Sequence, residues 1–478
     1  MATQTPTENR LVLDQTKKED RRVALATLVG TAIEWYDYFI YASAAALVLV
    51  PLFFEPFKET YGAVAGQILA FATVGVSFFF RPLGAMVAGH LGDKLGRKIM
   101  LVVTLILMGA ATTLIGLLPT YASAGMLAPV LLVALRILQG FSAGGEWGGA
   151  ALMAVEHAPT EKRGLFGGFP QIGVPVGMLM ATAVLGIMSA VTTEEQFLAW
   201  GWRVPFILSL GLVVVGIWIR KGVQESPVFQ EIKKSEEKVH LPLVQMFKYS
   251  GKQVALGALT FAGNSAMGYM ITGGYILAYT TQHLEVPRTT MLNLVTLAAA
   301  AWVVTTLFAA KLSDKITRQR TFQIGFVLQL IWLLPMFLLI DTARPWIIAL
   351  SMVTATLGLG MTYGPTSAMF AEMFPAKVRY SGAGITYAFG SIIGGAFAPM
   401  IAAALFAKFG TNVAVVGYLM TFSLIGLIAV SVLKDRTGGA LDASATDIEG
   451  QAQLEAALAK GAEDMGARSV TFDQDSGY

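Results

Sequence analysis

Long apolar runs separated by short polar loops make up most of the chain. A helix needs about 20 apolar residues to cross the hydrocarbon core of a bilayer. By that measure we predict an all-α membrane protein with twelve transmembrane helices in two six-helix halves. The predicted spans lie near residues 23–54, 66–88, 99–118, 126–155, 165–190, 203–219, 254–280, 291–310, 321–340, 346–371, 382–407 and 413–433.

Two repeated loops indicate that the chain has two similar halves. The loop at 89–98 is dense in glycine and charge, and a weaker copy occupies 310–320. The loops at 156–163 and 372–379 both begin with glutamate and end with arginine seven residues later. Repeated halves joined by a central linker are typical of secondary transporters, which place the substrate site between the halves.

The polar segments divide the chain into five parts. We predict a cytoplasmic N-terminal segment (1–22), an N-terminal six-helix half (23–219), a cytoplasmic linker (220–252), a C-terminal six-helix half (253–433) and a cytoplasmic tail (434–478). The polar composition of the tail predicts disorder.

Charge supports this topology. Only 14% of the residues are charged and 55% are hydrophobic, whereas a soluble domain carries roughly a quarter charged residues. Basic residues gather in alternate loops. The loops predicted to lie outside hold only Lys58, Arg203, Arg288, Arg344 and Lys408. Because the inner loops of membrane proteins are rich in Lys and Arg, both termini are predicted to be cytoplasmic.

Several chemistries are excluded or disfavoured. The chain has no cysteine, which excludes disulfides and thiolate ligands. Its four histidines are scattered over loops without metal-ligand spacing, so no metal site is expected. We find no phosphate-binding loop and no catalytic triad, which favours gradient-driven transport over an ATP-driven pump or an enzyme.

The loop at 89–98, the predicted spans and the repeated inner loops resemble the major facilitator superfamily over about residues 20–435. The second copy of the loop departs from the family pattern at Thr317, where glycine is usual. Segments that resemble the narrower metabolite:proton symporter family are 34–38, 80–84, 136–140, 144–149, 201–206 and 225–229. Segments similar to its shikimate-carrying members are 279–282, 286–288, 292–293, 369–374 and 379–384.

This resemblance implies a proton-coupled symporter of the plasma (inner) membrane that imports shikimate or a related hydroxylated organic acid. The expected partners are that small-molecule substrate, protons and the lipid bilayer, with no nucleic acid, and the chain is expected to be monomeric. No cofactor is expected beyond the proton as coupling ion. Alternatives are another mono- or dicarboxylate, an osmolyte such as proline or betaine, proton-coupled export, and a receptor built on a transporter scaffold.

Charges inside predicted spans are candidates for proton coupling, because a charge at the bilayer centre costs about 2.5–3.5 kcal/mol on insertion scales. Glu34 and Asp37 lie three residues apart in the first span, and two close carboxylates cannot both ionise cheaply. Arg136, in the fourth span, either binds the substrate carboxylate or pairs with one of these acids. Arg81 either extends towards the membrane surface or serves a cavity, and Glu146 has no assigned role.

Polar and aromatic neighbours of these charges are candidates for substrate binding. Tyr38 and Tyr41 follow Glu34 and Asp37 by one turn. In the seventh span, polar residues at spacings of four, four and three would bind ligand hydroxyls or form a helix-packing seam. The full substrate-binding prediction is Arg136, Gln139, Tyr38, Tyr41, Trp147, Asn264, Thr272 and Tyr275.

The charged inner loops are candidates for a gate. In the superfamily such residues form charge networks that close the cytoplasmic side; the simpler alternative is that they only orient the chain in the membrane. The predicted gate consists of Gly89, Asp93, Gly96, Arg97, Glu156, Arg163, Asp314, Arg318, Glu372 and Arg379.

Overall fold

The computed structural model describes residues 6–95, 97–221, 242–272, 274–374, 379–439 and 441, and no strand occurs among them. We call residues 6–221 the N-terminal half and residues 242–441 the C-terminal half. The long helices of the N-terminal half are α1 (Pro6–Leu47), α4 (Ala63–Leu95), α5 (Arg97–Leu117), α7 (Leu127–Ala143), α8 (Glu146–Glu156), α9 (Arg163–Val191) and α11 (Arg203–Lys221). Those of the C-terminal half are α13 (Pro242–Thr272), α14 (Tyr275–Gln282), α15 (Arg288–Ile316), α16 (Arg318–Ile340), α17 (Pro345–Tyr363), α18 (Thr366–Met373), α19 (Arg379–Gly390), α20 (Ala398–Phe409) and α21 (Val413–Val432).

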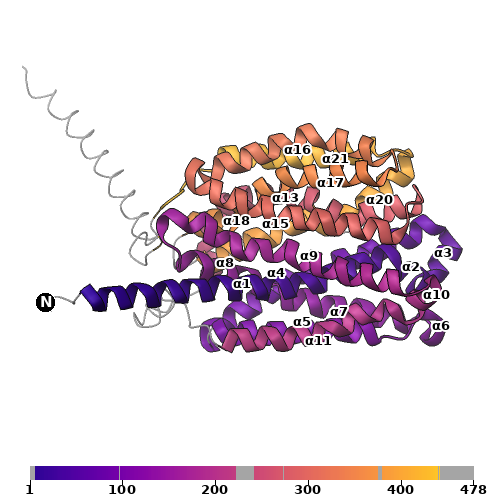
Figure 1. Ribbon diagram of the computed structural model, residues 1–478, viewed down its shortest axis with the longest axis horizontal. Coiled ribbons are helices and arrows are strands. Elements are labelled where there is room, and N and C mark those ends of the chain that lie inside the picture. Colours follow the sequence, from indigo (N-terminus) through magenta and orange to yellow (C-terminus); the bar gives the residue numbers. More distant parts are fainter. Residues whose placement is uncertain are drawn as a thin grey trace, which may run out of the picture.

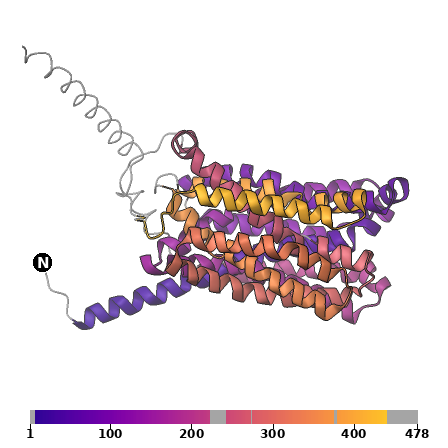
Figure 2. The ribbon, with the colours of Figure 1, turned by 90° about the horizontal axis from the view of Figure 1, so that it is seen from above.

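These helices run side by side in one bundle (Figures 1 and 2). The first residues of α1 and the described part of the tail lie at the same end, which we call the terminal end (Figure 1). The other end, here the far end, carries the short helices α2 (Leu49–Phe53), α3 (Glu55–Tyr61), α6 (Tyr121–Ala124) and α10 (Glu194–Gln196).

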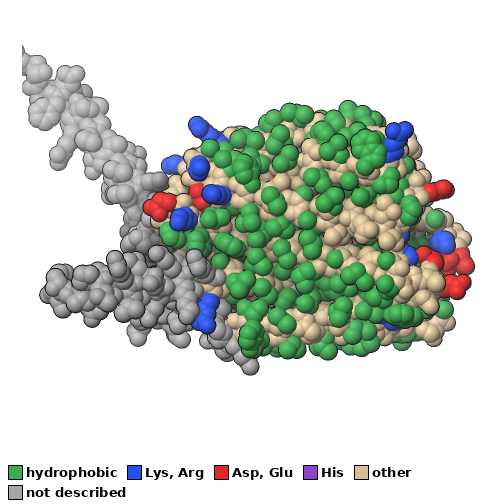
Figure 3. Space-filling view, in the orientation of Figure 1, with side chains coloured by type: hydrophobic (Ala, Val, Ile, Leu, Met, Phe, Trp, Pro, Cys, Tyr) green, Lys and Arg blue, Asp and Glu red, His purple; other side chains and the backbone are tan. Residues whose placement is uncertain are grey.

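The surface and the helix lengths suit a bilayer. Charged side chains gather at the two ends, and a largely hydrophobic band separates them (Figure 3). Among the described residues, nine helical stretches are long and apolar enough to cross a membrane, and the bent pair Glu194–Gly201 and Arg203–Ile219 makes ten if counted as one span. Val102–Leu117 is a shorter apolar helix. The all-α membrane fold is confirmed, and the count of twelve spans stays a prediction.

Small residues bring α7 directly against α4. A Cβ atom on Gly140 would lie 1.9 Å from the carbonyl oxygen of Ser77, and one on Gly144 would lie 1.9 Å from that of Arg81. Small residues spaced by four allow two membrane helices to approach this closely. The face of α7 that carries Gly140 is therefore occupied by α4.

Several helices stop and restart within the bundle. α7 gives way to α8 at Gly144–Gly145, and α13 gives way to α14 at 273–274, where Gly274 has φ of +90°. Only glycine adopts such a conformation without strain. α19 passes through a π-helical turn, Ser391–Ala396, before α20 begins. Such turns are frequent at functional sites.

Candidate functional site

A buried cavity lies between the two halves, and we call it the central cavity. The accessible space inside it is about 20 Å³, enough for a water-sized group in this conformation. The N-terminal half contributes one residue each from α1 and α9; the rest of the wall comes from α13, α15, α17 and α19. It is lined by Trp35, Val174, Phe261, Asn264, Ser265, Gly268, Tyr269, Trp302, Tyr363 and Tyr387.

The wall of the central cavity is aromatic but has polar tips. The indole nitrogens of Trp35 and Trp302 and the hydroxyl of Ser265 are buried, and among the described residues they have no hydrogen-bond partner. Asn264 donates to Thr362 Oγ1 at 2.7 Å. Because an unpaired buried donor costs about 1–3 kcal/mol, a ligand that accepts hydrogen bonds here would be stabilised.

Trp147 forms the layer directly behind this wall. Its ring stacks on Tyr387, with centroids 3.8 Å apart and planes inclined by 11°. Its indole N–H donates to Gln171 at 3.1 Å, and Gln171 donates to the carbonyl of Tyr363 at 3.0 Å. The stacking on Tyr387 and the hydrogen bond from Gln171 to Tyr363 cross from the N-terminal to the C-terminal half, so Trp147 supports the cavity without lining it.

Arg136 lies away from the central cavity, against α4. It donates to the carbonyl oxygens of Thr73 and Val74 at 3.2 and 3.0 Å, to Ser77 Oγ at 2.8 Å and to Gln139 at 2.7 Å. Its guanidinium carbon lies 3.8 Å from the ring centre of Tyr41. Protein groups thus occupy this guanidinium, and no ion pair among the described residues includes it.

The sequence left two roles open for Arg136, and the structure gives it a third arrangement. Gln139 donates to Thr112 Oγ1 at 2.6 Å, and Thr112 lies within interacting distance of the Asp37 carboxyl. Arg136 therefore reaches Asp37 through two neutral side chains rather than by direct contact. Asp37 is also held by the hydroxyl of Ser209, at 2.5 Å.

Glu34 and Asp37 face different surroundings. Both are 1% exposed. Asp37 is directed at α5 and α11, whereas Glu34 interacts electrostatically with Tyr269 and Tyr387 of the central cavity. A separation of three residues turns a helix by about 300°, which leaves the two side chains roughly 60° apart. Asp37 is thus held inside the N-terminal half, whereas the charge of Glu34 acts on two tyrosines of the cavity wall without Glu34 lining the cavity.

The remaining predicted binding residues are dispersed. Tyr38 packs with Tyr269, ring centres 5.7 Å apart, and its hydroxyl has no hydrogen-bond partner among the described residues. Tyr41 bonds to Thr73 at 2.6 Å, away from the cavity. Tyr275 belongs to α14 and donates to Asn412 at 2.9 Å, so the break at 273–274 removes it from the polar stripe of α13.

Two residues of that stripe, Asn264 and Gly268, do line the cavity, and the side chain of Thr272 is outside the described residues. The other aromatic residues of the wall were not among the predicted site residues. Tyr363 and Tyr387 stand out in the sequence as polar aromatics of unknown orientation, whereas Trp35, Tyr269 and Trp302 were not predicted to line a site. The sequence shows only that each is a Trp or Tyr within an otherwise apolar span. It does not show which face of that helix lies towards the cavity.

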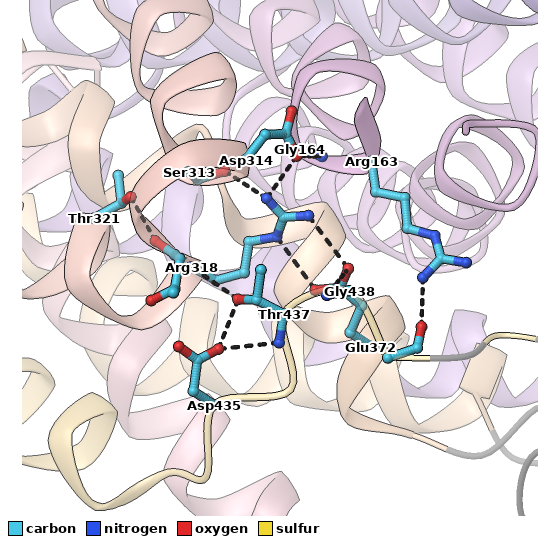
Figure 4. A network of polar contacts seen from close by, with 12 residues as sticks. Arg163, Gly164, Ser313, Asp314, Arg318, Thr321, Glu372, Asp435, Thr437 and Gly438 are labelled. Atoms are coloured by element: carbon cyan, nitrogen blue, oxygen red, sulfur yellow. Dashed lines mark hydrogen bonds and ion pairs between the residues drawn. The ribbon is translucent and has the colours of Figure 1, made fainter. Parts of the chain in front are cut away.

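At the terminal end, Arg318 is the centre of a polar network (Figure 4). Its guanidinium pairs with Asp314 at 2.7 Å and with Glu372 at 3.2 Å, and it donates to Ser313 Oγ at 3.0 Å. All of these residues belong to the C-terminal half. The arginine that follows the unusual Thr317 is therefore buried and paired.

Two contacts extend this network across the halves. The Asp314 carboxylate accepts the backbone N–H groups of Gly164 and Leu165, at 2.7 and 2.9 Å, at the start of α9. A carboxylate at a helix N-terminus is favoured by the unpaired N–H groups and by the helix dipole. Arg379 pairs with Glu156 at 3.4 Å. The terminal end is thus joined by charge-assisted contacts between the halves.

The start of the tail is part of the same arrangement. We call residues 435–439 and 441 the docked tail. Arg163 donates to the carbonyl of Gly439, and Arg379 donates to that of Leu441 at 3.0 Å. Leu441 packs in a small apolar cluster that includes Leu152 of α8 and residues of α18. The prediction of a disordered tail therefore does not extend to these residues; residues 442–478 lie outside the described part of the chain.

Asp435 anchors the docked tail through hydroxyl groups. Partial burial alone would raise the pKa of its carboxyl, but hydrogen bonds from the hydroxyls of Thr317 and Thr437 and from the Thr437 N–H outweigh it and lower that pKa. The Arg318 charge acts in the same direction. Asp435 therefore stays ionised at neutral pH.

Other predicted gate residues cannot be placed. Gly96, and the side chains at positions 89, 93 and 97, lie outside what the structure describes, as does most of the predicted linker. At the far end the halves also touch: Arg288 pairs with Glu194 at 2.9 Å, and Gln282 donates to Gln67 at 2.9 Å. The central cavity thus lies between contacts at both ends.

Comparison with known proteins agrees with this architecture. The pattern of the Major Facilitator Superfamily matches residues 27–399 and 258–449. The "Shikimate transporter" of Escherichia coli (strain K12) is 39% identical over 420 residues, which cover 87% of this chain and 94% of that protein. An "Inner membrane metabolite transport protein" of the same strain is 38% identical, covering 86% and 93% of the two chains.

A solved structure gives the same fold. The crystal structure of a D-xylose-proton symporter superposes with a TM-score of 0.69 at 18% sequence identity, covering 88% of this chain and all of that one. These relatives are transporters rather than enzymes. The helical bundle, its cavity between two halves and the extent of these matches lead to one conclusion: the chain belongs to the Major Facilitator Superfamily of membrane transporters.

Proposed function

We propose that the protein is a proton-coupled symporter that imports shikimate or a related hydroxylated organic acid. The observation that carries the proposal is the central cavity, which is small, buried between the halves and fitted with unpaired hydrogen-bond donors, and on whose Tyr269 the charge of Glu34 acts. Similarity to the Shikimate transporter supports the choice of substrate. In this proposal Asn264 and the unpaired donors bind the hydroxyl groups of the substrate.

Proton coupling is assigned to Asp37, Glu34 and Arg136. Asp37 is buried among hydroxyl groups, and Thr112 and Gln139 connect it to the Arg136 charge. Ionising a carboxyl at this depth is costly unless water or a cation is near, so proton loading is tied to whether the site is closed. Glu34 links substrate binding to proton binding in this proposal, because a substrate in the central cavity changes the environment of the tyrosines on which the Glu34 charge acts.

The charged contacts at the terminal end act as the gate. Asp314 at the start of α9 and the pair of Arg379 with Glu156 hold the halves together there. The cavity opens at the terminal end when these contacts break and the far-end contacts hold. It opens at the far end when the far-end contacts break and the terminal-end contacts hold. Because basic residues gather in the loops of the terminal end, we assign that end, with both termini, to the cytoplasm of an inner membrane.

Transport by purified protein tests the proposal. Proteoliposomes containing the chain take up labelled shikimate against its gradient when the outside is acidified, and a protonophore abolishes the accumulation. Uptake of a different carboxylate instead of shikimate would overturn the substrate assignment. Exchange without any dependence on the proton gradient would overturn symport. A single chain encloses the cavity, so activity is expected from monomers.

A further inference from the structure

Arg81 is a buried cation that the coupling scheme does not use. Its side chain is 5% exposed, although α4 places it within the hydrophobic part of the bundle. No ion pair among the described residues includes it, and its Nε–H has no hydrogen-bond partner there. Burying a charge without such partners is costly, so the arrangement calls for an explanation.

The position of Arg81 connects it to the central cavity. Its guanidinium carbon lies 5.3 Å from the ring centre of Trp35, which lines the cavity, and 4.2 Å from that of Phe78. Its charge also acts on the phenol groups of Tyr269 and Tyr387 on the opposite wall. The guanidinium is thus held against aromatic faces, and its Nε–H has no hydrogen-bond partner among the described residues.

Arg136 provides the contrast. It lies in the same half and is equally buried, but backbone carbonyls, Ser77 and Gln139 take up its donors. A carboxylate can approach Arg136 only by displacing these partners. The same approach to Arg81 displaces no hydrogen bond at Nε.

We propose that Arg81, and not Arg136, binds the carboxylate of the substrate, and that the ring of the substrate lies against the aromatic wall formed by Trp35, Tyr269 and Tyr387. This inference rests on the proposed function and names the recognition group within it. A planar guanidinium with an unpaired Nε–H donor matches a carboxylate in a way that an ammonium does not. The site therefore selects small monocarboxylates that carry hydroxyl groups on an apolar ring.

The test compares an acid with its uncharged ester. Equilibrium binding of shikimate and of shikimate methyl ester is measured on purified wild type, Arg81→Gln and Arg81→Lys. Wild type prefers the acid by roughly 10- to 100-fold, as expected for a charge-assisted hydrogen bond. Arg81→Gln loses this preference because its affinity for the acid falls while its affinity for the ester stays. Arg81→Lys retains part of the preference because the charge is kept.

Arg344→Gln serves as the matched control, since this arginine is exposed at the far end and is expected to keep the full preference. If Arg81→Gln binds the ester as wild type does and still prefers the acid, the inference is overturned. Arg81→Gln could instead fail to bind either ligand. If Arg81→Lys then prefers the acid as strongly as wild type does, a guanidinium is not required and the inference is overturned. If wild type binds another carboxylate and not shikimate, the substrate assignment fails alone, and the same comparison with that acid and its ester decides the role of Arg81.

Discussion

At the scale of single residues, the buried charges differ in their hydrogen-bond partners and not in how deeply they are buried. Arg81 and Arg136 are both buried within the N-terminal half, but only Arg136 has its donors taken by backbone and side-chain oxygens. Glu34 and Asp37 separate in the same way, one towards the cavity and one into the half. Local partners thus decide which charges are structural and which can respond to a ligand or a proton.

The first prediction concerns Asp37. Asp37→Asn keeps a hydrogen-bonding side chain of the same size next to Ser209 but cannot gain or lose a proton. We expect it to abolish concentrative shikimate uptake, by at least about tenfold, while exchange of labelled for unlabelled substrate persists. Uptake and exchange are measured in proteoliposomes.

The exposed Glu59→Gln is the control and should behave as wild type. Accumulation by Asp37→Asn at the wild-type level would move the proton site elsewhere, with Glu34 as the next carboxyl to substitute.

The role of Arg136 shows what the sequence could and could not predict at this scale. The sequence identifies Arg136 as a charge within a span, because its apolar context is visible. Its direction depends on Gly140 and Gly144, which bring α4 against that face and cover it. Such packing between distant segments is not encoded in the spacing of α7 alone.

At the scale of helices, close packing and breaks matter more than length. The apolar runs predicted the all-α membrane fold, and nine described helical stretches, or ten with the bent pair, are long and apolar enough to cross a membrane. The break between α13 and α14 removed Tyr275 from the predicted polar stripe. Gly274, with φ of +90°, precedes α14, and Gly144 and Gly145 separate α7 from α8, so the assumption of regular helices fails at both places.

The second prediction concerns the contact of α7 with α4. Gly140→Ala puts a Cβ atom against the carbonyl of Ser77, so the helices must separate. We expect a destabilisation of about 1–3 kcal/mol, as for other overpacked sites. It is measured as a lower midpoint of thermal unfolding in detergent, followed by tryptophan fluorescence.

Gly211→Ala on α11 is the matched substitution, because a Cβ atom there meets no other atom within 4 Å. It should leave the midpoint unchanged or raise it slightly, since alanine favours helix more than glycine does. Equal effects of the two substitutions would show that close approach at Gly140 is unimportant.

At the scale of the whole molecule, the halves touch at both ends around a closed cavity, so transport requires the two sets of contacts to break in turn. The terminal end relies on buried charges and the docked tail, whereas the far end uses an ion pair of Arg288 with Glu194, whose carboxylate is exposed to solvent. Exposed pairs contribute little, about 0–1 kcal/mol. The terminal end should therefore be the firmer of the two seals.

The third prediction tests that seal. Asp314→Ala removes the acceptor for two N–H groups of α9 and one partner of Arg318. A loss of 1–2 kcal/mol from the closed state raises the open population about 5- to 30-fold. The chain has no cysteine, so a single Ser367→Cys at the interface between the halves reports opening through its rate of maleimide labelling.

Glu194→Gln at the far end is the control and should not increase labelling from the terminal side. An unchanged labelling rate in Asp314→Ala would show that this carboxylate does not hold the gate.

The fourth prediction concerns pH. The folded protein lowers the pKa of Asp435, so its stabilising contribution is complete above the ordinary value of about 3.9 and is lost as pH falls through the lower, folded value. Wild type should therefore be slightly more stable than Asp435→Asn at pH 5–8, by at most about 1 kcal/mol because the side chain is exposed. The advantage should vanish in strong acid.

Thermal unfolding of both proteins across pH measures this difference. An advantage that disappears between pH 5 and 8 would contradict the assignment and would require another titrating group at the terminal end.

The docked tail has a thermodynamic consequence for the working transporter. Its carbonyl groups accept hydrogen bonds from Arg163 of the N-terminal half and Arg379 of the C-terminal half, so the Arg163 bond is made only while the halves are together at the terminal end. Linkage is reciprocal: if closing that end favours tail docking, tail docking favours closure by the same free energy. Anything that competes for the tail, whether a protein, a lipid headgroup or a covalent modification, would then be felt at the central cavity as a change in apparent substrate affinity, without touching the substrate.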